Sequence, residues 1–331
     1  MRVLVTGGAG YIGSHCVRAL CAAGHEVTVF DDLSAGHAAA VQAPAELIVG
    51  SLGDRPHLDA VFSAGRFDAV MHFAASIEVG ESVRTPLRYY QNNVANSISL
   101  LMAMERAAVR RMVYSSTCAV YGIPPRTPIT EDMPLSPQSP YARAKLAVEW
   151  ALVDSAAAWG LGFVAMRYFN AAGASGDAAI GEDHDPETHL VPNVLRVALG
   201  QARRVQVFGT SHPTPDGTCI RDYVHVDDLA DAHVRALPAA EPGVVRFYNC
   251  GTGRGASVRE VIDACRRVTG HAIPTEDCPP RAGDVPVLFA DASRLHRELG
   301  WRPTYEDVDR IIASAWEWHR THPNGFGDRA V

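Results

Sequence analysis

The chain has 331 residues, of which 47% are hydrophobic and 20% charged, and its formal net charge at pH 7 is -7. This composition is typical of a soluble globular protein with one large core or two modest domains. Basic and acidic residues are interspersed, which argues against a nucleic-acid partner. No window reaches the roughly 18 apolar residues that a membrane span needs, so no membrane partner is expected.

The N-terminus and the cysteines both predict a cytoplasmic protein. Met1 leads directly into the strand-like residues 2–6, without the pattern of a signal peptide. The seven cysteines form no Cys-x-x-Cys pair, and an odd number without motif spacing favours reduced thiols. The 14 histidines show no metal-ligand spacing such as His-Glu-x-x-His, so the sequence predicts no metal site.

The first half of the chain alternates short apolar runs with longer helical patterns. This alternation predicts a parallel sheet covered by helices on both faces, the doubly wound Rossmann-type arrangement. The expected strands are residues 2–6, 26–30, 46–50, 68–73, 111–115 and 162–168. The expected helices are residues 11–23, 54–64, 82–108 and 141–160.

The regular alternation ends after residue 170, where a smaller mixed α/β domain is expected to bind the substrate. Loops are expected at 171–190 and 279–284, strands at 205–208, 246–250 and 285–290, and helices at 226–237, 257–268 and from about 305. The two predicted domains interleave. The larger one consists of residues 1–169 and about 220–252, and the smaller one of about 170–219 and 253–331.

A glycine-rich turn links the first strand to the first helix. Gly7, Gly10 and Gly13 are spaced as G-x-x-G-x-x-G, and Gly8 with the last two gives G-x-G-x-x-G. Such glycines allow a tight turn and close approach of the backbone to a pyrophosphate, which the free amides of the helix N-terminus can bind. Because the turn lies between a strand and a helix, it predicts a dinucleotide site in the larger domain.

The second strand ends in Asp31-Asp32, about 20 residues beyond the glycine turn. An acid at this point can accept both hydroxyls of an adenosine ribose and would repel a 2′-phosphate, so NAD is favoured over NADP. Asp31 is the favoured ligand, while Asp32 can also be explained as a turn residue.

Tyr141 and Lys145 are one helical turn apart and therefore lie on one face of a helix. A lysine ammonium close to a phenol favours the phenolate and turns the tyrosine into a usable base. Thr117 follows the 111–115 strand, at the sheet edge where ligands gather. Taken singly, the lysine could be a solvated side chain and Thr117 a structural hydroxyl.

Together these residues resemble the extended short-chain dehydrogenase/reductase superfamily, specifically its UDP-glucose (UDP-galactose) 4-epimerase branch. The resemblance covers nearly the whole chain. Its motifs lie at residues 7–15, 31–34, 72–75, 79–82, 89–94, 139–145, 167–170, 216–218, 221–226 and 281–284.

The resemblance implies reversible C4 epimerisation of a UDP-hexose through a transient 4-keto sugar, with tightly bound NAD. Tyr141 is expected to be the base, Lys145 to lower its pKa, and Thr117 to hold the reacting oxygen where many relatives have serine. Members of this branch are usually homodimers, here pairing through residues 82–108 and 141–160. The catalytic residues also contact the two ligands.

The resemblance assigns further residues to the two nucleotide sites. The NAD site would contain Gly7, Gly10, Tyr11, Ile12, Gly13, Asp31, Asp32, Ser51, Leu52, Phe73, Ala74, Ala75, Asn92, Tyr141, Lys145 and Tyr168. The UDP-sugar site would contain Thr117, Asn170, His189, Leu190, Val207, Phe208, Arg221, Arg281, Asp284 and Leu288. Ser51 departs from the usual aspartate beside adenine.

Cys118 and Ala119 argue against dehydratase and decarboxylase activity, whereas the sequence does not identify the sugar of the UDP-sugar substrate. Nucleotide-sugar dehydratases carry an Asp-Glu pair directly after the catalytic threonine, where this chain has Cys118 and Ala119. Decarboxylases usually carry a glutamate there. A non-catalytic NAD-binding protein would be expected to lack the tyrosine or the lysine. Leu288 does not choose between UDP-hexoses, UDP-N-acetylhexosamines and UDP-pentoses.

Overall fold

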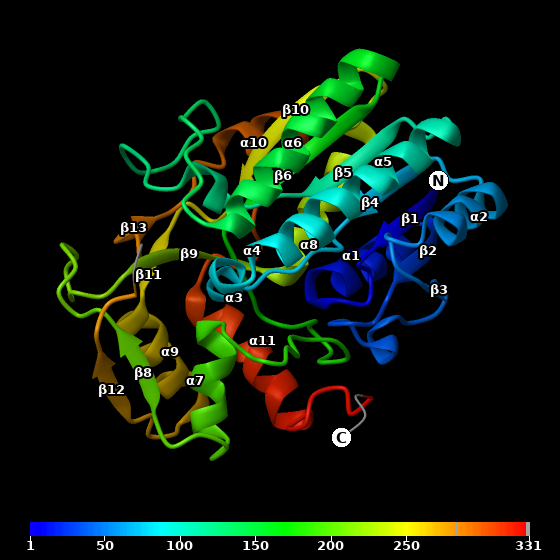
Figure 1. The fold of residues 1–331 in the computed structure, drawn as a ribbon. Helices are drawn as coiled ribbons and strands as arrows, with labels where there is room; N and C mark the ends of the chain where they lie inside the picture. Colours follow the sequence, from blue (N-terminus) through cyan, green and yellow to red (C-terminus); the bar gives the residue numbers. More distant parts are fainter. Residues whose placement is uncertain (282–283, 329–331) are drawn as a thin grey trace.

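The computed structural model describes residues 1–281 and 284–328. Its centre is a seven-stranded sheet in which all neighbours are parallel, in the order β10-β6-β5-β4-β1-β2-β3 (Figure 1). The strands are β1 Arg2–Thr6, β2 Glu26–Asp31, β3 Glu46–Val49, β4 Ala69–His72, β5 Arg111–Ser115, β6 Gly162–Tyr168 and β10 Val245–Cys250. The order reverses between β1 and β4, so ligands are expected above the carboxyl ends of these strands.

Helices cover both faces of the sheet because its central strands are apolar on both sides. On one face, Val17 and Leu20 of α1 (Tyr11–Ala22) pack with Leu229 and Leu237 of α8 (Val226–Ala239). The other face is covered by helices whose buried residues form a second cluster. These helices are α2 (Arg55–Gly65), α5 (Asn96–Arg106) and α6 (Pro140–Trp159).

The local sequence explains where α6 begins and ends. The Ser139 hydroxyl accepts a hydrogen bond from the Ala142 amide, and Pro140 occupies the first turn, where a missing amide costs nothing. Gly160 ends the helix in the left-handed conformation, with φ of 76°. These two ends fix the position of the Tyr141 and Lys145 helix.

The single helix predicted for residues 82–108 is wrong. The structure divides this stretch into α3 (Val79–Arg84), α4 (Pro86–Tyr89), a π-helical turn (Tyr90–Ala95) and α5. Pro86 is the reason for the first break, because a proline restricts the preceding residue and Thr85 has the non-helical φ of -129°. The π-helical turn packs against α6.

A smaller group of elements lies beside the large sheet, below and to its left in Figure 1. Its core joins three helices and a two-stranded sheet. The helices are α7 (Leu190–Ala198), α9 (Val258–Thr269) and α11 (Val308–Thr321), and the strands are β8 (Val205–Phe208) and β12 (Thr275–Cys278). The sequence patterns missed α7, β12 and the short helix α10 (Ser293–Leu299).

A second small sheet lies between the two groups, with β9 (Ile220–His225) at its centre. It pairs with β7 (Asn170–Ala172), β11 (Gly255–Ser257) and β13 (Val287–Leu288). The predicted strand 285–290 is therefore only two residues long. Ala282 and Gly283 of the 281–284 motif lie outside the described residues. Two short 3₁₀ turns complete the elements, Ala38–Ala40 and Cys118–Tyr121.

The predicted division into two domains stays a prediction. β10 does extend the large sheet beyond β6, whereas β9 belongs to the small sheet. No helix in the described part of the chain is both long and apolar enough to cross a membrane.

Candidate active site

The glycine turn lies at the carboxyl end of β1, with α1 beginning at Tyr11 directly after it. Gly10 precedes the helix and no side chain caps it, so the first amides of α1 are left for another acceptor. The Tyr11 hydroxyl donates to the Gly173 carbonyl at 2.7 Å, which fixes the first residue of α1 against the chain after β7. This arrangement fits a dinucleotide pyrophosphate.

Close backbone contacts require glycine at positions 7 and 13. A Cβ on Gly13 would lie 2.1 Å from the Gly7 carbonyl oxygen, and one on Gly7 would lie 2.3 Å from the Ala74 amide nitrogen. Gly7 also has a φ of 74°, in the left-handed region. The turn can therefore pack this tightly only without side chains.

Asp31 ends β2 beside the glycine turn. Its buried carboxylate accepts hydrogen bonds from the Ala9 amide at 3.0 Å and from the Leu33 amide at 2.9 Å. Burial raises the pKa of this carboxyl, and the two amides lower it. Asp32 instead accepts from the Ser34 amide at 3.0 Å, as a turn residue does.

The other predicted cofactor residues follow neighbouring strands. Phe73 and Ala74 donate their amides to the Thr6 carbonyl, at 2.8 and 3.1 Å, which holds the chain after β4 close to the glycine turn. Ser51 accepts from the Gly53 amide at 3.2 Å, and Asn92 donates to the Ser76 hydroxyl at 3.0 Å. Leu52 is buried and Ala75 is half-buried.

Tyr141 and Thr117 meet at the carboxyl end of β5, and both side chains are buried. Burial is the main cause that raises the pKa of Tyr141 above its ordinary value, and a hydrogen bond with Thr117 lowers it. Tyr168, at the end of β6, shares a hydrogen bond of 2.9 Å with Ser115 beneath this pair.

Lys145 is fully buried one turn along α6 from Tyr141. Desolvation lowers its pKa to about 7, and Glu149 raises it. Its ammonium donates to the Ser115 carbonyl at 2.8 Å, and Lys145 is not among the principal influences on the Tyr141 pKa. Lys145 is the only lysine of the chain, in which Lys and Arg together number 30. That isolation is a sequence signal for a special role, because arginine cannot be deprotonated in proteins.

Sequence reasoning missed a buried ion pair that lies beside Lys145 on α6. Glu149 accepts two hydrogen bonds from Arg167, at 3.0 and 2.7 Å, and one from the Ser116 hydroxyl at 2.6 Å. Glu149 is one turn beyond Lys145, so the spacing 141, 145 and 149 could have indicated it. The pair holds α6 against the ends of β5 and β6.

Cys118 and Ala119 supply no acid or base beside Thr117. Desolvation raises the pKa of the Cys118 thiol to about 12, so it stays protonated near neutral pH. Alanine has no titratable group. The site can therefore move one proton through Tyr141, but it lacks the additional acid–base pair that elimination of water needs.

Two arginines lie on the side of the small elements. The Arg221 guanidinium on β9 donates to the Val285 carbonyl at 2.7 Å and to its neighbour Ile220 at 2.9 Å. The Arg281 guanidinium stacks over the Phe208 ring, 4.1 Å from its centroid. Arginine forks and an aromatic face suit a nucleoside diphosphate.

The remaining predicted substrate residues are spread over three elements. Asn170 is half-buried on β7, and His189 precedes the first residue of α7, Leu190. The Val207 side chain on β8 is fully buried in the core, so only its backbone can face a ligand. The Asp284 amide donates to the Arg281 carbonyl at 3.2 Å, and Leu288 is half-buried on β13.

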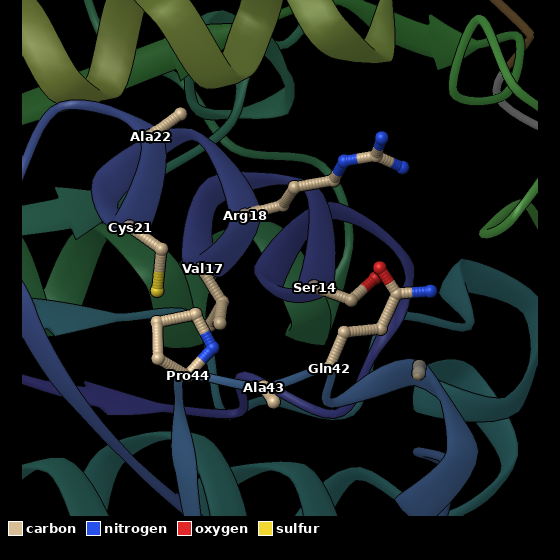
Figure 2. Close-up of a pocket in the computed structure, with 9 residues that line it drawn as sticks. Ser14, Val17, Arg18, Cys21, Ala22, Gln42, Ala43 and Pro44 are labelled. Atoms are coloured by element: carbon tan, nitrogen blue, oxygen red, sulfur yellow. The ribbon is translucent and has the colours of Figure 1, made fainter.

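A separate pocket lies between α1 and the segment 40–44, and Figure 2 shows the side chains that line it. They include Arg18, Cys21 and Gln42. The pocket lies along the length of α1, away from the turn at its N-terminus, and contains none of the predicted site residues.

Comparisons with known proteins agree with this geometry. Residues 3–251 match the NAD dependent epimerase/dehydratase family. The chain is 48% identical to the UDP-glucose 4-epimerase of Lacticaseibacillus casei, covering 99% of this chain and 100% of that one. The solved UDP-glucose 4-epimerase from Bifidobacterium longum, in complex with NAD+ and UDP, has a TM-score of 0.95 at 39% identity, covering 98% of this chain and 100% of that one. The one from Stenotrophomonas maltophila, with bound NAD and formylated UDP-arabinopyranose, has a TM-score of 0.94 at 41% identity, covering 98% and 99%.

The chain belongs to the NAD dependent epimerase/dehydratase family. Its relatives at almost half identity over the full chain are UDP-glucose 4-epimerases. These findings confirm the predicted resemblance, the doubly wound fold, the dependence on NAD and the predicted class of enzyme. The glycine turn and the buried Asp31 carboxylate are the features of this chain that fit NAD.

Proposed function

We propose that the protein interconverts UDP-galactose and UDP-glucose by inverting C4 of the sugar. The observation that carries this proposal is the meeting of Thr117, Tyr141 and Lys145 at the carboxyl end of β5. The lack of a second acid or base at positions 118 and 119 favours epimerisation over dehydration. The UDP-glucose 4-epimerases at almost half identity support the choice of a hexose.

The catalytic roles follow from the chemistry of the three side chains. Tyr141 removes the proton of the 4-hydroxyl and returns it after the 4-keto sugar has presented its other face. Thr117 holds the 4-oxygen, and its hydrogen bond lowers the pKa of Tyr141, which burial raises. Lys145, one turn along α6, would hold the nicotinamide ribose of the cofactor. The chemistry that NAD supplies when bound is reversible hydride transfer at C4. Each turnover therefore leaves the cofactor unchanged.

The test is to incubate the purified protein separately with a UDP-hexose, a UDP-N-acetylhexosamine and a UDP-pentose, and to identify the products by NMR. We expect C4 inversion with the hexose fastest. Faster inversion of either of the other sugars would contradict the choice of substrate. Bound NAD without inversion of any sugar would contradict the proposed activity.

We also propose that two copies pair through α5 and α6 in the cytoplasm. Large apolar side chains are exposed on these neighbouring helices, among them Trp150 at 61%, Val153 at 41% and Met102 at 39%. An exposed apolar patch on adjacent helices is typical of an interface. The seven cysteines, all described and all free, support a reducing compartment.

Light scattering after gel filtration tests the pairing. Trp150→Glu is expected to convert a dimer into a monomer, because a charge would be buried at the centre of the interface. Ile123→Glu is the matched control, since Ile123 is 65% exposed but lies outside these helices. A wild-type monomer, or a Trp150→Glu dimer, would contradict the proposal.

A further inference from the structure

Four metal-ligating side chains converge in the loop that connects β7 to α7, residues 173–189. They are Glu182, His184, Glu187 and His189, and one donor atom from each lies within 4.8 Å of all the others. The spacing Glu-x-His-x-x-Glu-x-His matches no helical metal motif. The sequence patterns therefore predicted no metal, and only the folded loop brings these side chains together.

Both imidazoles direct Nδ1 at the same two carboxylates. Glu182 Oε1 lies 2.5 Å from His189 Nδ1 and 3.3 Å from His184 Nδ1. Glu187 oxygens lie 3.8 and 3.9 Å from the same two nitrogens. Ligands arranged tetrahedrally at about 2.0 Å from a zinc ion are about 3.3 Å apart, a value within the range of these four contacts.

Among the described residues, the only ion-pair partners of Glu182 and Glu187 are the imidazoles of His184 and His189. The Glu182 and Glu187 side chains are only 4% and 2% exposed, and within the described residues no lysine or arginine forms an ion pair with either. His184 Nδ1 is itself fully buried, has no hydrogen-bond partner in the described part of the chain, and faces the Glu182 carboxylate. Buried charges of this kind are normally paired or coordinate a metal.

A second group of possible ligands, His212, Cys219 and Asp284, makes a useful contrast. Arg221 and Arg281 act electrostatically on Cys219, so a cation there would be repelled. That group also lies among the predicted substrate residues. In the cluster of the 173–189 loop, the ion pairs among described residues involve no arginine or lysine.

We propose that Glu182, His184, Glu187 and His189 bind a divalent transition-metal ion, with zinc the best match. Two imidazoles and two carboxylates are a donor set for zinc and its neighbours in the first transition row, whereas calcium and magnesium prefer oxygen ligands alone. The ion takes the place of the proton between His189 and Glu182.

The position of the cluster gives the ion a structural role. The His184 ring contacts Tyr11 of α1 edge-on, with 6.1 Å between centroids. Trp318 of α11 donates to the Glu182 carbonyl at 3.2 Å, and His189 is the N-cap residue directly before α7. The ion therefore joins the loop to the helix of the glycine turn and to the helices of the smaller group of elements.

The test uses the NAD-bound protein, purified without a metal-affinity column, stripped with a chelator and then dialysed against zinc. We expect about one zinc ion per chain by mass spectrometry and a raised melting temperature, because binding only the folded state stabilises it. His184→Gln with Glu187→Gln should lose both effects. His271→Gln with Glu306→Gln, both exposed and outside the cluster, is the matched control and should keep them.

Equal zinc binding by the cluster variant, or no binding by the wild type, would overturn the proposal. Because the cluster variant could fail to fold, cobalt provides a second measurement on the unaltered chain. Tetrahedral Co²⁺ bound to the wild type should give strong visible bands that zinc abolishes. Only the weak bands of octahedral, water-bound cobalt would contradict the four-ligand site.

Discussion

The two proposed nucleotide sites of this protein are built in different ways. The proposed cofactor site consists of backbone amides of the glycine turn and one buried carboxylate, all positioned by β1, β2 and α1. The proposed substrate site consists of long side chains, such as Arg221 and Arg281, on the small sheet and its loops. Between them, Tyr141 and Lys145 are held by a helix with well-defined ends.

This difference predicts different responses to mutation. A site made from backbone fails when an added atom changes the course of the chain. A site made from side chains loses affinity one contact at a time. The activity of the proposed catalytic pair, Tyr141 and Lys145, depends on the protonation state of its side chains. Ligand binding in the two nucleotide sites does not depend on proton transfer. Four changes test this division.

The largest effect is expected at the catalytic pair. Tyr141→Phe removes the only proposed proton acceptor and should lower kcat by about 10²–10⁴-fold. Cofactor content should be unchanged, because the glycine turn and Asp31 are intact. Turnover is followed by NMR of the UDP-sugar and bound NAD by release on denaturation. Turnover close to that of the wild type would contradict the assigned role.

Lys145 should titrate near neutral pH. As the only lysine, it gives a single side-chain resonance in protein labelled with ¹³C-lysine, and in the cofactor-free protein that resonance should titrate at about 7. Burial lowers the pKa of Lys145 from 10.5, because the buried ammonium destabilises the folded state. This destabilisation of the folded state is complete below about pH 7 and vanishes above the ordinary pKa of lysine.

Unfolding measurements give the sign of the same effect. Between about pH 7 and pH 10 the unfolded chain binds more protons, so the stability of the wild type relative to Lys145→Met should rise by a few kcal/mol. A difference in unfolding free energy that stays constant with pH would show that burial does not perturb Lys145.

The cofactor side should be sensitive to a single methyl group. Gly13→Ala places a Cβ 2.1 Å from the Gly7 carbonyl oxygen, an overlap expected to cost about 1–3 kcal/mol and to release NAD. Gly176→Ala is the control, because a Cβ there meets nothing within 4 Å. Retention of NAD by Gly13→Ala would show that the turn can relax.

The smallest effect is expected on the substrate side. Arg281→Met keeps an apolar contact with Phe208 but removes the charge, and should raise KM about ten-fold, or ~1.4 kcal/mol, with kcat little changed. Arg254→Met is the control, because Arg254 is an exposed arginine paired with Glu306. An unchanged KM would remove Arg281 from the proposed substrate site.

The sequence by itself determined the class of the fold and most strands and helices of the large sheet. The alternating strands and helices, the glycine turn, Asp31, and the Tyr141–Lys145 spacing are local patterns, and local patterns fix local structure. The prediction of one long helix over 82–108 was wrong because Pro86 keeps Thr85 out of the helical conformation. α7 was missed because it follows a loop without a periodic signal.

Only the tertiary structure decided the arrangement of groups distant in the sequence. Glu149 on α6 bonds to Arg167 on β6 and to Ser116, which follows β5. Strand β9 pairs both with β7, which begins at residue 170, and with β13, which ends at residue 288. The two glutamates and two histidines of the 173–189 loop are close in sequence but converge only when the loop folds against α1 and α11. Irregular backbone has no period, so its side-chain directions are set by packing and cannot be derived from spacing.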